Sequence, residues 1–385
     1  MSWILENIKN MRALKQIADK LKLVNRHVRP GPIGLAFAIE KVYLVQLEQK
    51  PDGEIVLRAS AAVEYPSSRE ELLVSSKEVK SLLQQALKSA PFSGRNIVTT
   101  LLPSDIRMMS IAYQLDKGKS ETDAILKLLE SRIKGDLIDY VIDYLPIRVH
   151  SSDDERLALV ALAKRDTVFE YLESLRMAGF MVDALDIAPS AIKRLISAVS
   201  DVDRTDNILV INFGGIRSYM TLISGQRLLF DQGIDFGEVH LIERIASSLD
   251  LSKEQARELV YAHGLSPSNP NQEDNYQLPD EEVSETLLEI VKPKFLKLVN
   301  EINRVLIYAA SETRGKPVKH VYLLGSIARW HGADKVLNKL INIPVSLPNF
   351  ISKFGNASDY GNYEDSLPEM AVATGLALRG MKIVV

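Results

Sequence analysis

The hydrophobic pattern of the chain changes from a helical to a strand-like period after the first thirty residues. Apolar residues recur every three or four positions from Ile4 to Leu21, with Lys and Arg between them, which predicts an amphipathic helix. Pro30 and Pro32 then interrupt the pattern, so we expect residues 1–31 to form a separate N-terminal segment.

Two sets of three strand-like runs follow, the second set beginning about 175 residues after the first. The first set covers 33–39, 42–49 and 55–65, and the second covers 207–213, 218–224 and 226–233. A helical pattern follows the third strand of each set. Strands that alternate with helices predict an α/β fold, and the repeated order predicts two related halves.

Helical and polar segments fill the rest of the pattern. We expect one helix at 68–89, a strand at 96–102, helices at 190–199 and 239–250, and a long helix at 283–311 that Pro293 kinks or splits. Residues 264–286 are polar, acidic and rich in Pro and Asn, which predicts a flexible surface loop.

Composition removes several classes of function. The chain of 385 residues has a net charge of −3, which argues against a general nucleic-acid binder. It has no cysteine, so disulfides, thiolate catalysis and zinc ribbons are excluded. Its six histidines lack metal-ligand spacing, and no apolar run is long enough for a transmembrane helix. We expect a cytoplasmic protein without a metal site.

Positive charge is concentrated in the N-terminal segment, which carries seven basic and two acidic side chains in residues 1–30. One interpretation is a helix that lies on an anionic membrane surface. The membrane-facing candidates are then Trp3, Ile4, Lys9, Arg12 and Lys15. The other interpretation is a helix that packs on the protein's own core with its lysines in water.

Small residues cluster at three points where a strand leaves a sheet, at 34–38, 212–218 and 324–328. Glycine at a strand end lets backbone N–H groups approach a phosphate, although any one cluster by itself is better explained by a tight hairpin. The order and spacing of the three clusters resemble the actin-like ATPases, and more closely the PilM family of type IV pilus assembly proteins.

The resemblance extends from about Pro32 to Arg379. Its short matching strings are 96–103, 175–189, 228–237, 301–304, 323–328 and 371–378. It implies an actin-like (ribonuclease-H-like) fold with duplicated domains and an inserted α/β subdomain. The implied boundaries are a first half of 32–66 completed by 183–204 and 360–385, an inserted subdomain of 67–182, and a second half of 205–359 with a helical part at about 238–318.

The nucleotide loops depart from the family pattern. The first loop has Ala36 where the family has an acidic residue, and Glu40 would bring a carboxylate beside a phosphate. Asn212 replaces an aspartate, and Ile327 puts a branched side chain in the adenosine loop. The residues that remain form at most a vestigial nucleotide site: Gly34, Asn212, Gly214, Gly215, Ser218, Gly325 and Ser326.

The resemblance therefore implies a scaffold that binds the cytoplasmic N-terminal tail of a PilN-like inner-membrane protein, peripherally at the inner membrane and without ATP hydrolysis. We expect no catalytic residue, and either no cofactor or weakly bound ATP and magnesium. The alternative is a working ATPase or a filament-forming protein, with Asp231 or Asp235 as the metal carboxylate and Arg217 on a phosphate. The chain could also form homo-oligomers.

Overall fold

The computed structural model describes residues 29–381 apart from 116–117, 119, 134, 148–154, 201–202, 204, 226, 266–277 and 356–366. The predicted N-terminal helix lies outside the described residues, and so do its membrane-facing candidates from Trp3 to Lys15. Among the described helices, none combines the length and the apolar character needed to cross a lipid bilayer.

The first sheet has five strands in the spatial order β3-β2-β1-β4-β8. Its strands are β1 (Arg29–Phe37), β2 (Lys41–Gln49), β3 (Ile55–Glu64), β4 (Asn96–Thr100) and β8 (Met181–Asp186). β2 is antiparallel to both β1 and β3, whereas β4 is parallel to both β1 and β8. Both faces of β1 are covered, which explains why its sequence is a continuous apolar run.

The second sheet repeats this topology in the order β11-β10-β9-β12-β13. Its strands are β9 (Asn207–Phe213), β10 (Ser218–Ser224), β11 (Arg227–Ile234), β12 (Val318–Gly325) and β13 (Val345–Ser346). Again the first three strands form an antiparallel meander and the last two add in parallel. The predicted α/β fold with two related halves is confirmed.

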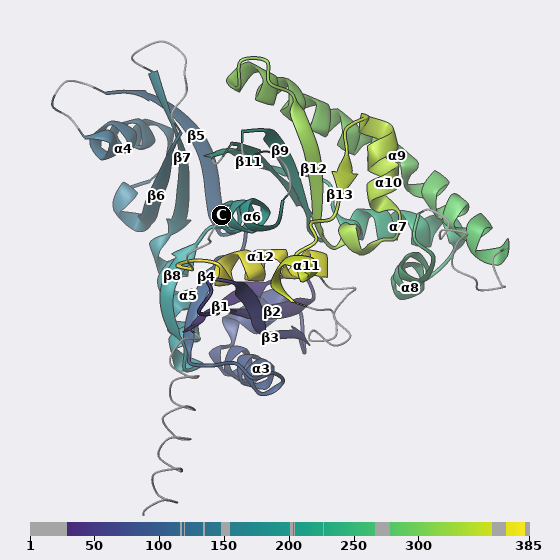
Figure 1. Ribbon diagram of the computed structural model, residues 1–385, viewed down its shortest axis with the longest axis horizontal. Coiled ribbons are helices and arrows are strands. Elements are labelled where there is room, and N and C mark those ends of the chain that lie inside the picture. Colours follow the sequence, from purple (N-terminus) through teal and green to yellow (C-terminus); the bar gives the residue numbers. More distant parts are fainter. Residues whose placement is uncertain are drawn as a thin grey trace, which may run out of the picture.

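Two helices lie between the sheets and join the halves (Figure 1). They are α6 (Ala188–Val199) and α12 (Leu367–Ala377). One apolar cluster contains side chains from both helices and from both sheets, including Tyr43 of β2 and Val210 of β9. The halves therefore share a hydrophobic core, and their contact does not depend on surface loops alone.

A third, antiparallel sheet stands beside these layers in the order β5-β7-β6. It consists of β5 (Ile106–Gln114), β6 (Tyr140–Ile147) and β7 (Glu155–Lys164), and helix α4 (Glu121–Arg132) packs on one of its faces. The sequence pattern did not reveal β5, because polar residues interrupt its apolar positions. β4 lies within the predicted inserted range 67–182 but belongs to the first sheet. The separate third sheet therefore begins only with β5.

The single helix expected at 68–89 is instead two helices, α2 (Arg69–Val74) and α3 (Ser76–Lys88). Ser75 separates them because it has extended backbone angles and ends α2 while its hydroxyl caps α3, accepting from the Glu78 amide. A serine that caps a helix satisfies an otherwise unpaired amide, and this favours a break at that residue over continuation of one helix.

The long helix α9 (Leu278–Glu312) starts earlier than expected and runs through Pro293 without a split. The predicted loop 264–286 is therefore wrong from residue 278 onward. A proline inside a helix removes one hydrogen bond. Burial of Val291 and Phe295 on either side of Pro293 offsets this loss.

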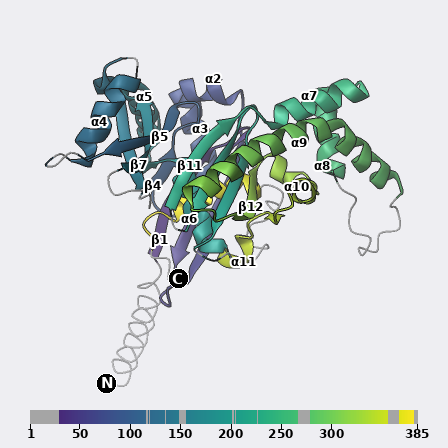
Figure 2. The same ribbon diagram turned by 90° about the horizontal axis from the view of Figure 1, so that it is seen from above.

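The remaining helices and turns lie in the two halves and beside the third sheet. They are α5 (Arg165–Met177), α7 (Glu238–Leu249), α8 (Lys253–His263), α10 (Ala333–Ile341), α11 (Ile351–Phe354), and the 3₁₀ turns η1 (Leu137–Asp139) and η2 (Ile327–Arg329). Figure 2 shows α7, α8 and α9 on the side of the molecule opposite α4 and the third sheet.

Candidate functional site

Six of the seven predicted nucleotide-loop residues lie around the carboxyl end of β9. Gly325 pairs with Phe213 in the β9–β12 ladder, and the Ser326 amide donates to the Phe213 carbonyl at 3.1 Å. A Cβ on Gly325 would lie 2.1 Å from that same oxygen. The six residues that come together are Asn212, Gly214, Gly215, Ser218, Gly325 and Ser326.

Gly34 is the exception, because it lies in the middle of β1 and not in a loop. A Cβ on Gly34 would come within 1.9 Å of the Ala373 carbonyl oxygen in α12. The glycine at this position therefore lets a helix pack directly on the strand. The turn between β1 and β2 is formed instead by residues 38–40.

That turn of the first half meets the second half through side chains. A Cβ on Gly215 would lie 3.2 Å from Ile39 Cγ2, which places the Ile39 side chain directly against the Gly214–Gly215 turn. Glu40 Oε1 forms an ion pair with Nη1 of Arg257 in α8 at 2.9 Å. The facing turns are thus in contact with each other.

The polar groups of these turns are used within the protein. The carbonyls of Gly214 and Gly215 accept the first amides of α7, from Glu238 at 3.0 Å and Val239 at 2.9 Å. The Ser218 hydroxyl donates to the Phe236 carbonyl. A phosphate at a helix N-terminus needs free N–H groups, and these two amides are already bonded.

A chain of buried polar side chains crosses from the first half to the second. Tyr43 Oη of β2 donates to Glu369 Oε2 of α12 at 2.7 Å. The same carboxylate oxygen lies 3.3 Å from Nη1 of Arg329, which belongs to the second half. Glu369 and Arg329 are about nine-tenths buried, with side-chain exposures of 5% and 11%.

This series of hydrogen-bonded side chains continues within the second half. Arg329 Nη2 donates to Tyr261 Oη of α8, and the guanidinium carbon lies 4.6 Å from the centre of that ring. Tyr261 Oη donates to Glu238 Oε1 at 2.8 Å, and Trp330 Nε1 donates to the same oxygen at 2.9 Å. Burial raises the pKa of Glu238. We call these six residues the inter-half network: Tyr43, Glu369, Arg329, Tyr261, Glu238 and Trp330.

The alternative metal carboxylates, Asp231 and Asp235, already have polar partners within the protein. Asp231 accepts a 2.6 Å hydrogen bond from Thr221 Oγ1 across β10 and β11, and burial raises its pKa to about 6. Asp235 is exposed and lies 3.1 Å from Arg217 Nε. Among the described residues, no three His, Asp or Glu side chains group as metal ligands. The residues present do not fit a magnesium nucleotide.

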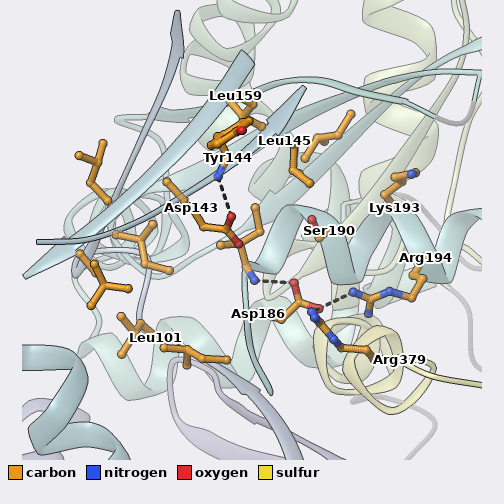
Figure 3. Close-up of a pocket in the computed structure, with 18 of the residues that line it drawn as sticks. Leu101, Asp143, Tyr144, Leu145, Leu159, Asp186, Ser190, Lys193, Arg194 and Arg379 are labelled. Carbon is orange, nitrogen blue, oxygen red and sulfur yellow. Dashed lines mark hydrogen bonds and ion pairs between the residues drawn. The ribbon is translucent and has the colours of Figure 1, made fainter. Parts of the chain in front are cut away.

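A large cavity of about 750 Å³ lies between the third sheet and α6 (Figure 3). Helix α4 covers one face of this sheet, and the cavity opens on the opposite face. Val141 and Leu145 of β6 are 39% and 38% exposed there, and Leu159 and Ala161 of β7 continue the apolar floor. We call this cavity the sheet–helix groove.

The opposite wall of the groove is the polar face of α6. Ser190, Lys193, Arg194 and Ser197 line it at helical spacing, whereas the apolar face of α6 packs into the core between the sheets. The sequence predicted this helix, but the groove was missed. Adjacent basic residues on the polar face of a buried helix were the available signal.

Some of the charged side chains along this wall form ion pairs, and one does not. Arg194 and Arg379 both bind the Asp186 carboxylate, with Arg379 Nη1 at 2.8 Å from Oδ2. Lys193 forms no ion pair with any described residue. Burial lowers its pKa, and the positive charge of Arg194 lowers it further. The groove therefore combines an apolar floor with a hydrogen-bond donor that has no ion-pair partner among the residues that the structure describes.

Comparisons with solved structures identify the fold. A chain from a "PilM-PilN type IV pilus biogenesis complex" matches with a TM-score of 0.71 and 22% identity, over 91% of this chain and 99% of that chain. The ethanolamine utilization protein EutJ from Carboxydothermus hydrogenoformans matches with 0.53 and 13%, over 91% and 90%. A nucleotide-free diol dehydratase-reactivating factor matches with 0.50 and 10%, over 91% and 99%. At these identities the matches show an actin-like fold.

The sequence comparison identifies the family. No curated protein sequence gives a significant match. A family model described as type IV pilus assembly protein PilM, however, matches residues 34–381, which include both halves and the third sheet. This chain belongs to the PilM family of type IV pilus assembly proteins.

Proposed function

We propose that this PilM-family protein is a scaffold of the pilus assembly machine, placed peripherally on the cytoplasmic face of the inner membrane. There it binds the cytoplasmic N-terminal tail of a PilN-like inner-membrane protein. The solved relative in complex with PilN motivates the choice of partner. The basic N-terminal segment supports a position close to an anionic membrane surface.

The sheet–helix groove carries the proposal for tail binding. Its volume of about 750 Å³ and its apolar floor, faced by polar side chains of α6, suit a short peptide with apolar side chains. Val141 and Leu145 expose apolar surface that a bound peptide would cover. Three parts of the molecule line the groove, so its shape depends on how the third sheet sits on the two halves.

A scaffold without ATP hydrolysis is supported by the contacts between the facing turns. Ile39 packs against Gly215, and Glu40 pairs with Arg257, where a nucleotide would need both turns to be open. Phosphoryl transfer depends on metal and positioned charge, and Asn212 lacks a carboxylate. The alternative, a working ATPase or filament-forming protein, requires these contacts to open when ATP and magnesium bind.

The test of tail binding is a substitution in the groove floor. Leu145→Glu places a carboxylate that a bound tail would bury without a partner, which is unfavourable. We expect the dissociation constant for the synthetic tail of the PilN-like partner to rise by at least about tenfold, measured by calorimetry.

Leu347→Glu is the matched control, because Leu347 is 40% exposed and Leu145 is 38% exposed, and Leu347 does not line the groove. This variant should bind the tail like the wild-type protein. Equal affinity of both variants, or weakened binding in the control alone, would contradict the proposal that the tail occupies this groove.

A further inference from the structure

β6 is an edge strand whose outer side lines the sheet–helix groove. Among the described strands it pairs with β7 alone, in the sheet order β5-β7-β6, and residues 143–146 of β6 all contribute to the groove wall. An edge strand beside a peptide groove ordinarily offers its N–H and C=O groups to the peptide, which then joins the sheet as a further strand.

The outer edge of β6 has lost most of its donors. The Tyr144 amide donates to the Asp143 carboxylate of its own strand at 2.8 Å (Figure 3). We infer from this bond that the amide lies on the outer side of β6 and not in the ladder with β7. Alternate residues of a strand direct their amides to the same edge, which places residues 142, 144 and 146 along the outer side. Pro146 has no N–H group. Only the amide of Ile142 remains among these three positions.

Side chains of the groove offer a bound peptide the contacts and hydrogen-bond donors that the main chain of β6 lacks. The floor offers apolar contacts from Leu145 and Leu159, and α6 offers Lys193, which has no ion pair among the described residues. Lys193 can donate to carbonyl or carboxylate oxygens of a bound peptide without any help from the sheet edge.

We propose that the groove recognises its tail through side chains, with the tail lying across the face of the third sheet and not adding a strand to β6. This inference rests on the proposed function. It predicts that recognition depends on the sequence of the tail, since main-chain pairing would be largely independent of sequence.

Two scans of the synthetic PilN-like tail test this mode of binding against the wild-type protein. Single N-methylation removes one backbone N–H at a time, and single alanine substitution removes one side chain at a time. We expect every N-methylated tail to bind within threefold of the unmodified tail, and alanine at two or more apolar positions to weaken binding more than tenfold. Losses above tenfold at alternating N-methylated positions would overturn the inference, because they indicate strand pairing.

Two variants of β6 test the same point from the protein side. Asp143→Ala frees the Tyr144 amide, and Pro146→Val restores an N–H group with a similar apolar side chain. We expect neither variant to bind the tail more than threefold more tightly than the wild-type protein, and self-association to increase because the edge is open. Tail binding that becomes more than tenfold tighter would overturn the inference. Asp143 is exposed, so its variant tests the edge even if Pro146→Val does not fold.

The two proposals fail in different ways. If the unmodified tail does not bind the wild-type protein at all, the proposed function fails and this inference fails with it. A different result would contradict the inference alone. In that case the tail binds the wild-type protein and the Leu145→Glu substitution weakens this binding, but N-methylation at alternating positions lowers the affinity of the tail more than tenfold.

Discussion

Asp231 is a half-buried carboxyl group in β11 that lines a cavity of about 40 Å³ together with Pro103 and Asn212. It accepts a hydrogen bond from Thr221, which an asparagine oxygen would also accept. Burial raises its pKa from 3.8 to about 6, so the folded protein binds this proton more tightly than the unfolded chain.

The first prediction concerns this carboxyl group. The tighter binding of this proton stabilises the folded protein. This contribution to the free energy of unfolding is largest below about pH 4 and is lost as the pH rises through 6. Asp231→Asn should therefore increase the free energy of unfolding at pH 7.5 by up to about 3 kcal/mol and leave it almost unchanged at pH 3.5. Urea denaturation at both pH values measures this, and lower stability of the variant at pH 7.5 would contradict it.

Arg329 is the residue that connects the two halves within the inter-half network. Arg329→Met leaves the buried Glu369 carboxylate without its cation, so we expect a loss of about 3–5 kcal/mol in the free energy of unfolding at neutral pH. Chemical denaturation at pH 7.5 measures this loss.

Arg257→Met is the matched control for that variant. Its ion pair with Glu40 also joins the halves, but the two side chains are 38% and 33% exposed. Exposed pairs contribute at most about 1 kcal/mol. Equal losses in the two variants would show that burial of the inter-half network has no special part in stability.

At the scale of elements, helix α6 serves two environments. Its apolar face packs with α12 between the sheets, and its polar face forms a wall of the sheet–helix groove. Because α6 is held on one side by the shared core, Lys193 and Ser190 are presented on a rigid element and not on a loop. The groove wall therefore has the stability of the core that supports it.

The N-terminal segment is the second element with a testable role. Deletion of residues 1–28, which ends before β1 at Arg29, should abolish binding to anionic liposomes if the basic helix lies on the membrane. Co-sedimentation with vesicles containing anionic lipid measures binding, and circular dichroism checks that the remaining chain is folded. Unchanged sedimentation would favour the interpretation that this helix packs on the protein's own core.

At the scale of the whole molecule, the two halves are held together by a shared core, the inter-half network and the contact of facing turns. A nucleotide between them would have to displace Ile39 and break the Glu40–Arg257 pair. Both changes cost free energy that a ligand must supply from its own contacts. The relative position of the halves is thus set without a ligand.

We therefore expect no heat signal when ATP and magnesium are titrated to millimolar concentration in a calorimeter. Asn212→Asp alone should not produce ATP hydrolysis, because the first turn still has Ile39 and Glu40 against the second half. Phosphate release measures hydrolysis. Magnesium-dependent binding at micromolar ATP would show that the turns open and would favour the ATPase alternative.

The sequence by itself determined the elements and their order. Apolar runs marked the strands of both meanders, and the repeated order of strands predicted two halves, because these patterns depend on which residues a few positions apart share a buried face. The same local information failed where a single residue changed the outcome. Ser75 divided a helix, and polar residues hid β5.

Tertiary structure alone decided what the glycines and the groove do. Gly34 belongs to a pattern that also occurs in phosphate loops, yet its partner is Ala373, nearly 340 positions away. The groove likewise combines β6, β7, α6 and Arg379, which no periodicity relates to one another. Periodicity reports the environment of one element, whereas a site depends on contacts between elements that only the folded chain brings together.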